Sequence, residues 1–217
     1  MDEYLIQAII AQYNLQQAYA YTPNVPFDIE HRDECIAQLQ TKLRGLHRTY
    51  TEHLTAEQLA HILDNISQDF ADLADINILD WQHENIRNRC CDLYNRVKEM
   101  LKECGLRKPG MRAITTIISS VFGSIPVITK EMVRGLHYLG LLPHDTTESF
   151  RRVLDAIGNF ILNHEDTIVH ILTNALKLTN VAIAGVPVGD ILLILHYVGR
   201  IIYDQRNENQ HHHRRNR

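Results

Sequence analysis

Residues 167–203 read TIVHILTNALKLTNVAIAGVPVGDILLILHYVGRIIY, and Lys177, Asp190 and Arg200 are the only full charges in this stretch. Glycine and proline at 185–189 divide it into two arms of helical length, because proline removes a backbone donor and glycine favours a turn. Both arms are apolar along most of their length. We therefore expect other helices, a partner or a lipid surface to cover them.

The composition favours an all-α fold. Hydrophobic residues make up 45% of the 217 residues and charged residues 22%, as is typical of globular proteins. The chain has 10 glycines and 6 prolines, and it lacks the Asn-Gly and Asp-Gly pairs that signal β-hairpins. We expect a multi-helix bundle of about eight or nine helices.

Heptad-spaced apolar residues pattern the front half of the chain, which predicts a short antiparallel bundle. The first seam lies in a predicted helix over 28–53 and comprises Ile36, Leu39, Leu43, Leu46 and Tyr50. The second lies in a predicted helix over 80–105, capped by Asp80, and comprises Ile86, Cys90, Leu93, Val97, Met100 and Cys104. Between them, Thr55 and Gln58 fit a capping box that starts a third helix, whose expected buried face is Leu59, Ile62, Leu63, Ile66, Phe70 and Leu73.

The rear half is more apolar and contains further predicted helices. Residues 111–124 mix isoleucines with small residues that allow close helix approach. Thr129 is expected to cap a helix over 130–142, and residues 145–148 to cap the next one. The expected buried face of that helix is Phe150, Val153, Leu154, Ile157 and Ile161.

These patterns predict three regions. Residues 1–105 form an acidic helical bundle region, including an N-terminal helix on a proline-containing linker, and residues 106–204 form an apolar helical region. The polar tail at 205–217 is expected to be disordered. The basic Pro-Gly turn at 107–110 marks the boundary between the first two regions.

The net charge of −4 hides an asymmetry. The formal charge is −8 over residues 1–104 and +4 over residues 105–217. Opposite charges allow the two regions to attract each other. Basic charge beside apolar surface also suits an anionic membrane, so both interpretations stay open.

The apolar arms allow two interpretations. Their uncharged runs are shorter than the ~20 residues that a spanning helix needs, which favours a helix pair in a protein core. The alternative is a conditional hairpin, released to insert into a membrane or form a pore, with residues 185–189 at its tip and the terminal arginines on an anionic surface. The candidate membrane or partner contacts are Ile183, Val186, Pro187, Leu192, Leu195 and Arg200, with a basic tail of Arg214, Arg215 and Arg217.

Catalytic and metal-binding signatures are missing from the sequence. It contains no HExxH, Gly-x-Ser-x-Gly, phosphate loop or dinucleotide fingerprint. The acid–histidine pairs Glu57/His61 and Asp166/His170 have helical spacing, but single pairs of this kind on helices are common by chance. We predict no catalytic residue, metal or cofactor, and the short basic tail is a poor match to nucleic-acid binding.

The cysteines and the N-terminal residues indicate the cellular compartment. Cys35, Cys90, Cys91 and Cys104 form no CxxC pair, which indicates a reducing compartment. Asp2 and Glu3 stand where a signal peptide would carry positive charge. We expect a cytoplasmic protein, or one associated with a membrane from the cytosolic side.

The sequence thus favours a non-enzymatic interaction or assembly protein of the effector, adaptor or viral structural type. It would act through helix faces, with a protein partner or a second copy of itself as ligand. The membrane-inserting hairpin at 167–203 is the alternative.

Overall fold

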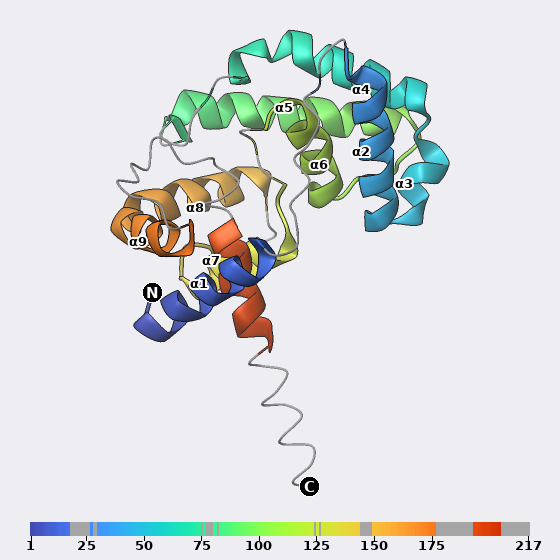
Figure 1. The fold of residues 1–217 in the computed structure, drawn as a ribbon. Helices are drawn as coiled ribbons and strands as arrows, with labels where there is room; N and C mark the ends of the chain where they lie inside the picture. The colour runs from blue at the N-terminus through green and yellow to red at the C-terminus, as the bar shows by residue number, and fades with distance from the viewer. Residues whose placement is uncertain are drawn as a thin grey trace, which may run out of the picture. The chain divides into compact units, whose positions relative to one another are not determined.

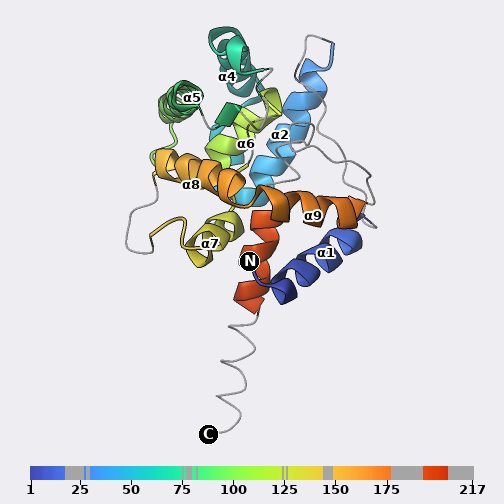
Figure 2. The same cartoon turned by 90° about the vertical axis from the view of Figure 1, so that its left-hand side faces the viewer.

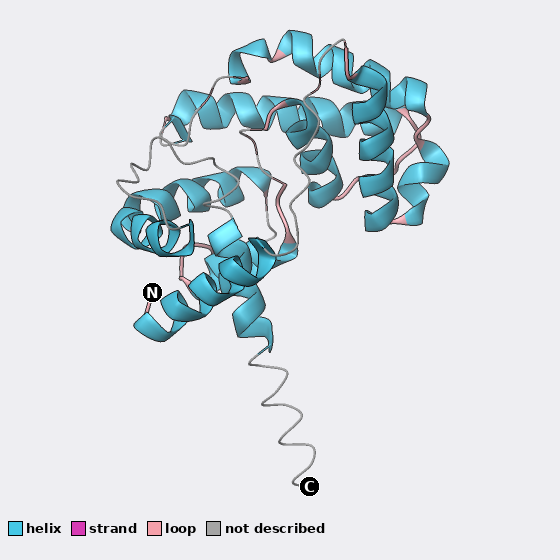
Figure 3. Ribbon diagram, in the orientation of Figure 1, coloured by secondary structure: helices cyan, strands magenta, loops and turns pink. Residues whose placement is uncertain are grey.

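The computed structural model describes residues 1–17, 27, 30–74, 76, 80–81, 83–123, 125, 127–143, 149–176 and 193–204. Over these residues the protein is helical and has no strand (Figures 1 and 3). The expected all-α fold of eight or nine helices is confirmed. The helices are α1 (Glu3–Gln17), α2 (Arg32–Leu46), α3 (Arg48–His53), α4 (Ala56–Asp69), α5 (Glu84–Glu103), α6 (Met111–Val121), α7 (Lys130–Tyr138), α8 (Phe150–Asn163) and α9 (Glu165–Leu176).

Two shorter features complete the described chain. The 3-10 turn η1 (Ala71–Leu73) follows α4, and a further helical segment covers residues 193–204. None of the described helices has both the length and the apolar character that a membrane crossing requires.

The chain forms two compact units. We call Thr22–Ile128 the central unit, and Met1–Tyr21 together with Thr129–Arg217 the terminal unit. This division differs from the expected regions, which were separated at residue 105 by charge and by a turn. α6 packs against α2, α4 and α5, so its apolar face belongs to the central unit, and α1 packs against α9 in the terminal unit (Figure 2).

The N-terminus of α4, in the central unit, has the structure that the sequence predicts. The Thr55 side chain accepts a hydrogen bond from the Gln58 N–H at 3.2 Å, and the Gln58 side chain accepts one from the Thr55 N–H at 2.9 Å. This is the capping box that the sequence predicts. The whole predicted apolar face is buried: Leu59, Ile62, Leu63, Ile66, Phe70 and Leu73.

The predicted helix over 28–53 is interrupted. α2 ends at Leu46 because His47 is extended, with φ −166° and ψ 133°, and α3 begins at Arg48. Ile36, Leu39 and Leu43 of the seam are buried, whereas Leu46 is half-buried and Tyr50 lies on α3. A seam of this length does not by itself require a continuous helix, since buried side chains can come from either side of a bend.

The second seam is confirmed in its centre, where Cys90, Leu93, Val97 and Met100 are buried. α5 begins at Glu84, with His83 as the N-cap residue, so Asp80 does not cap this helix as expected. The helix ends at Glu103, and Gly105 has φ +96°, the left-handed conformation that commonly follows a helix C-terminus.

A buried hydroxyl of α6 joins this helix to the end of the central unit. The Thr115 hydroxyl donates to the Met111 carbonyl at 2.9 Å and accepts from the Ile128 N–H at 3.0 Å. We expect Thr115→Val to lower the free energy of unfolding by ~1–3 kcal/mol, because valine keeps the shape but leaves a buried N–H unpaired.

Thr116→Val is the matched control for this prediction. The Thr116 hydroxyl donates only within its own helix, to the Arg112 carbonyl at 2.7 Å. Its replacement should therefore change the unfolding free energy by less than ~0.5 kcal/mol. Urea denaturation followed by circular dichroism measures both values, and equal effects would contradict a structural role for the Thr115–Ile128 bond.

In the terminal unit, the Thr129 side chain caps α7 by accepting from the Met132 N–H at 3.2 Å, as predicted. α7 ends at Tyr138, earlier than the expected residue 142. Ser149 caps α8 by accepting from the Arg152 N–H. The predicted cap at 145–148 lies outside the described residues. The predicted face of α8 is buried: Phe150, Val153, Leu154, Ile157 and Ile161.

The helical segment 193–204 is part of the core of the terminal unit. Ile194, Leu195, Tyr197 and Val198 are fully buried. The segment approaches α7 at two glycines: an ideal Cβ at Gly135 would lie 2.5 Å from the Leu195 carbonyl oxygen, and one at Gly199 would lie 1.8 Å from the Glu131 carbonyl oxygen. Only glycine permits this backbone contact.

Candidate functional site

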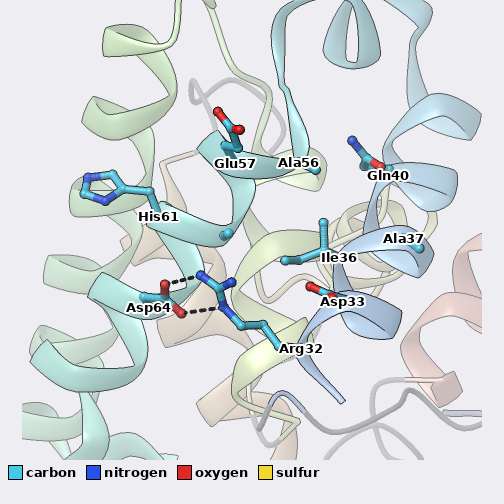
Figure 4. Close-up of a pocket in the computed structure, with 10 residues that line it drawn as sticks. Arg32, Asp33, Ile36, Ala37, Gln40, Ala56, Glu57, His61 and Asp64 are labelled. Atoms are coloured by element: carbon cyan, nitrogen blue, oxygen red, sulfur yellow. Dashed lines mark hydrogen bonds and ion pairs between the residues drawn. The ribbon is translucent and has the colours of Figure 1, made fainter. Parts of the chain in front are cut away.

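A groove of about 580 Å³ lies between α2 and α4 on the surface of the central unit (Figure 4). Arg32 at the start of α2 reaches Asp64 near the end of α4, so the two helices run antiparallel along the groove. Each helix contributes residues at helical spacing: Arg32, Asp33, Ile36, Ala37 and Gln40 from α2, and Ala56, Glu57, Ala60, His61 and Asp64 from α4.

Small and apolar side chains form the middle of the groove. Ile36 and Ala60 are buried beneath it, and the exposed Ala37 and Ala56 add only methyl groups to its walls. Short side chains on facing helices leave a depression into which side chains of another element can pack.

Charged side chains occupy the ends of the groove. Figure 4 shows Arg32 and Asp64 pointing toward one another across it. The Arg32 Nε donates to Asp64 Oδ1 at 3.2 Å, and Nη2 donates to Oδ2, so the pair is bidentate. The hydrogen bond to Asp64 raises the pKa of Arg32. Both groups are more than a third exposed, so the pair orders the groove more than it stabilises the fold.

The groove carries excess negative charge. Its lining holds three carboxylates, Asp33, Glu57 and Asp64, against the single guanidinium of Arg32. Asp33 and Glu57 are exposed, and within the described part of the chain no ion pair involves them. One of these two carboxylates stands on each helix. A ligand lying along the groove would therefore meet negative charge on both sides.

The sequence-predicted contact residues lie elsewhere. Leu195 is fully buried in the terminal unit, and Arg200 is half-exposed, 4.0 Å from Asp204 in an i,i+4 ion pair. The other predicted contacts and the basic tail lie outside the described residues: Ile183, Val186, Pro187, Leu192, Arg214, Arg215 and Arg217.

Sequence reasoning did not find the groove. Glu57 and His61 were noted only as a possible ligand pair, and Ala37, Ala56 and Ala60 gave no signal. Ala56 and Ala60 are four residues apart on α4. This spacing is weak evidence for a groove, because alanine is common in helices. These residues form a groove only because α2 packs against α4, and the sequence alone does not show that pairing.

Two buried side chains of the described chain have strongly raised pKa values. Burial raises the pKa of the Cys90 thiol to about 12, which keeps it protonated and poorly nucleophilic. Burial also raises the pKa of Tyr197 to about 12. No group of three metal-ligating side chains occurs in the part of the chain that the structure describes.

Comparison of the chain with models of protein families, with curated proteins and with solved structures gave no match. What the α2–α4 groove offers is shape and negative charge, which suit the binding of a cationic, helix-sized ligand.

Proposed function

We propose that the protein is a non-enzymatic interaction protein whose α2–α4 groove binds an amphipathic helix with basic flanks. The observation that carries this proposal is the pair of exposed carboxylates, Asp33 and Glu57, on opposite walls of an alanine-lined groove. Charge complementarity of this kind steers a partner and fixes its orientation.

The spacing of the groove residues supports a helix as the ligand. Asp33, Ala37 and Gln40 follow one another along α2 at intervals of four and three residues. Glu57, His61 and Asp64 do the same along α4. Two antiparallel helices with such rows present a channel that a third helix can enter with its own ridge of side chains, as in helix-in-groove recognition.

The ligand that fits best has small or medium apolar residues along one stripe and lysine or arginine beside it. The apolar stripe would cover Ala37 and Ala60, and the cationic residues would approach Asp33 and Glu57. We propose a segment of a different protein as the natural ligand. A second copy of this chain is the competing possibility, and sedimentation at increasing protein concentration separates the two.

The test uses a panel of labelled amphipathic peptides of about four helical turns, a length at which isolated helices begin to form. Each apolar stripe is made once with lysine flanks and once with glutamate flanks. We expect fluorescence anisotropy to show binding of lysine-flanked peptides only. Asp33→Lys should weaken that binding about tenfold, because it replaces an attraction by a repulsion.

Glu34→Lys is the matched control. Glu34 is exposed, precedes Cys35 on the first turn of α2 and does not line the groove, so the net charge and the helix dipole change equally. The control should leave peptide affinity within about twofold. Equal weakening by both variants would show non-specific attraction, and binding of the glutamate-flanked peptides would refute the proposal.

The membrane-inserting alternative has no comparable support in the described residues. The residues that flank its central stretch, from Ile168 to Ala175 and from Ile194 to Val198, include eight that are buried: Ile168, Ile171, Leu172, Ala175, Ile194, Leu195, Tyr197 and Val198. Insertion would have to remove these side chains from a packed core, at a cost of about 1.5–3 kcal/mol for each large one. We therefore propose the groove, and not the hairpin, as the functional element.

A further inference from the structure

A second cavity of the central unit, of about 670 Å³, lies where α3 meets the turn that follows α5. α3 and the residue before it contribute His47, Tyr50 and His53. The turn contributes residues 105–108. None of these residues takes part in the α2–α4 groove.

The polar side chains of this cavity share one chemical property, which is that each can donate a hydrogen bond. They are the imidazoles of His47 and His53, the phenol of Tyr50, the guanidinium of Arg107 and the ammonium of Lys108. Among the described residues, no carboxylate lines the cavity: Glu52 and Glu103 are close in sequence but do not contribute to its wall. Within the described residues, Arg107 and Lys108 form no ion pair.

The turn that presents Arg107 and Lys108 is fixed by its own backbone. Gly105, at φ +96°, allows the chain to reverse after α5. The Gly105 N–H donates to the Lys102 carbonyl at 2.9 Å, and the Leu106 N–H donates to the Leu101 carbonyl at 3.1 Å. These two bonds form a Schellman-type helix end, and the buried Leu106 anchors it. The backbone that leads into Arg107 and Lys108 therefore has a defined position.

Tyr50 joins the other wall of the cavity to the same turn. Its hydroxyl oxygen accepts a hydrogen bond from the Gly110 N–H at 3.2 Å, which leaves the phenolic proton as a donor. The ring of His47 lies edge-on to the ring of Tyr50, with centroids 6.2 Å apart. Donors from α3 and from the turn thus face one cavity.

Helix C-termini near the cavity could account for the positive charge in another way. A helix C-terminus carries roughly half a negative charge, and lysine, arginine or histidine beside it is stabilising. Four of the terminal carbonyls here already have backbone partners, however: Met100, Leu101 and Lys102 accept bonds from residues 104–106, and Leu43 accepts one from His47. The cationic side chains are not required to satisfy these four carbonyls.

We propose that this cavity binds a phosphate-bearing anion. A phosphate group accepts several hydrogen bonds at once and carries more than one negative charge. This matches the described lining residues, which supply five donors and no carboxylate. The volume leaves room for the rest of a small phosphorylated molecule. The phosphate could belong to a free molecule or to a lipid headgroup, and the experiment below distinguishes these sources. The site is independent of the proposed α2–α4 groove.

The experiment follows backbone amide signals of the whole chain by NMR. One arm adds inorganic pyrophosphate, and the other adds phosphatidylcholine vesicles with or without phosphatidic acid. We expect pyrophosphate to shift the signals of Tyr50 and residues 105–108 with a saturating curve, and added salt to weaken the binding. Broadening of the same signals only by vesicles with phosphatidic acid would assign the phosphate to a lipid.

Variants that remove positive charge from the cavity test whether pyrophosphate binds there. The double variant Arg107→Gln/Lys108→Gln should weaken pyrophosphate binding about tenfold or more, because hydrogen bonds to charged groups are the stronger ones. Arg96→Gln/Lys98→Gln is the matched control. It removes the same charge from α5, from two residues outside the cavity, and should leave affinity within about twofold.

Tyr50→Phe adds a test that does not change the charge. It removes one donor and also the acceptor of the Gly110 N–H, and we expect it to weaken binding about threefold to tenfold. The proposal is overturned if neither pyrophosphate nor phosphatidic acid perturbs the cavity signals. It is also overturned if the control double variant weakens binding as much as the Arg107/Lys108 variant does.

Discussion

Replacing Gly199 with alanine is expected to lower the free energy of unfolding of the terminal unit by about 3 kcal/mol. In an open helix the same change would stabilise the protein by up to ~1 kcal/mol, because glycine is a poor helix former. Here the added Cβ would lie 1.8 Å from the Glu131 carbonyl oxygen and 2.7 Å from its carbonyl carbon. These are backbone atoms of α7, so the helices must separate, and buried contacts of Leu195 and Val198 are weakened.

Gly45→Ala is the control with the opposite expected sign. Gly45 lies in α2, and nothing stands within 4 Å of an ideal Cβ at this position. We expect it to raise the unfolding free energy by roughly 0.5 kcal/mol. Urea titrations followed by circular dichroism measure both variants. A Gly199→Ala protein as stable as the starting protein would show that the close contact between α7 and residues 193–204 does not exist in solution.

Trp81→Ala is expected to cause the largest loss in the central unit, about 3–5 kcal/mol, the usual cost of removing a large buried aromatic ring. Trp81 is fully buried and is the largest side chain in the described core. Trp81 is the only tryptophan of the chain, and such a residue can serve either in a core or as an interface anchor. Its burial favours the structural role. The Arg87 guanidinium donates to the Trp81 carbonyl at 2.7 Å, and this backbone contact should survive the substitution.

Trp81→Phe tests how much the aromatic ring contributes to stability without the indole N–H. The indole N–H has no acceptor among the described residues. Its removal in Trp81→Phe therefore breaks no hydrogen bond within the described structure. We expect a loss of roughly half that of Trp81→Ala or less. Chemical denaturation followed by far-ultraviolet circular dichroism suits both variants, which lack tryptophan fluorescence. A loss for Trp81→Phe as large as that for Trp81→Ala would contradict this expectation, because it would show that the retained aromatic ring contributes nothing to stability.

Local signals in the sequence predicted local structure well. The Thr55–Gln58 capping box, the Thr129 cap and the buried faces of α4 and α8 all follow from side-chain type and spacing, because each depends on residues within a few turns. The break at His47 could not be predicted in this way. The spacing of the seam continues through it, and an extended histidine has no sequence signature.

Features that depend on distant residues were not predicted. The expected boundary at residue 105 followed charge, whereas the compact units follow the packing of α6 and α1. The contact of Gly135 and Gly199 with backbone atoms was missed because an isolated glycine in a helix has several explanations. The α2–α4 groove was missed since it requires the pairing of two helices, which single-sequence periodicity does not specify.

The discontinuous terminal unit has a consequence for the order in which the protein matures on the ribosome. Residues 22–128 are all synthesised before α7 begins, so the central unit has every partner it needs while translation continues. α1 is made before the central unit but packs against α9, which is made after it. The apolar face of α1, with Leu5, Ile6 and Ile9, is therefore without α9 until the central unit, α7 and α8 have been synthesised. Its apolar side chains are therefore exposed while the central unit is being made.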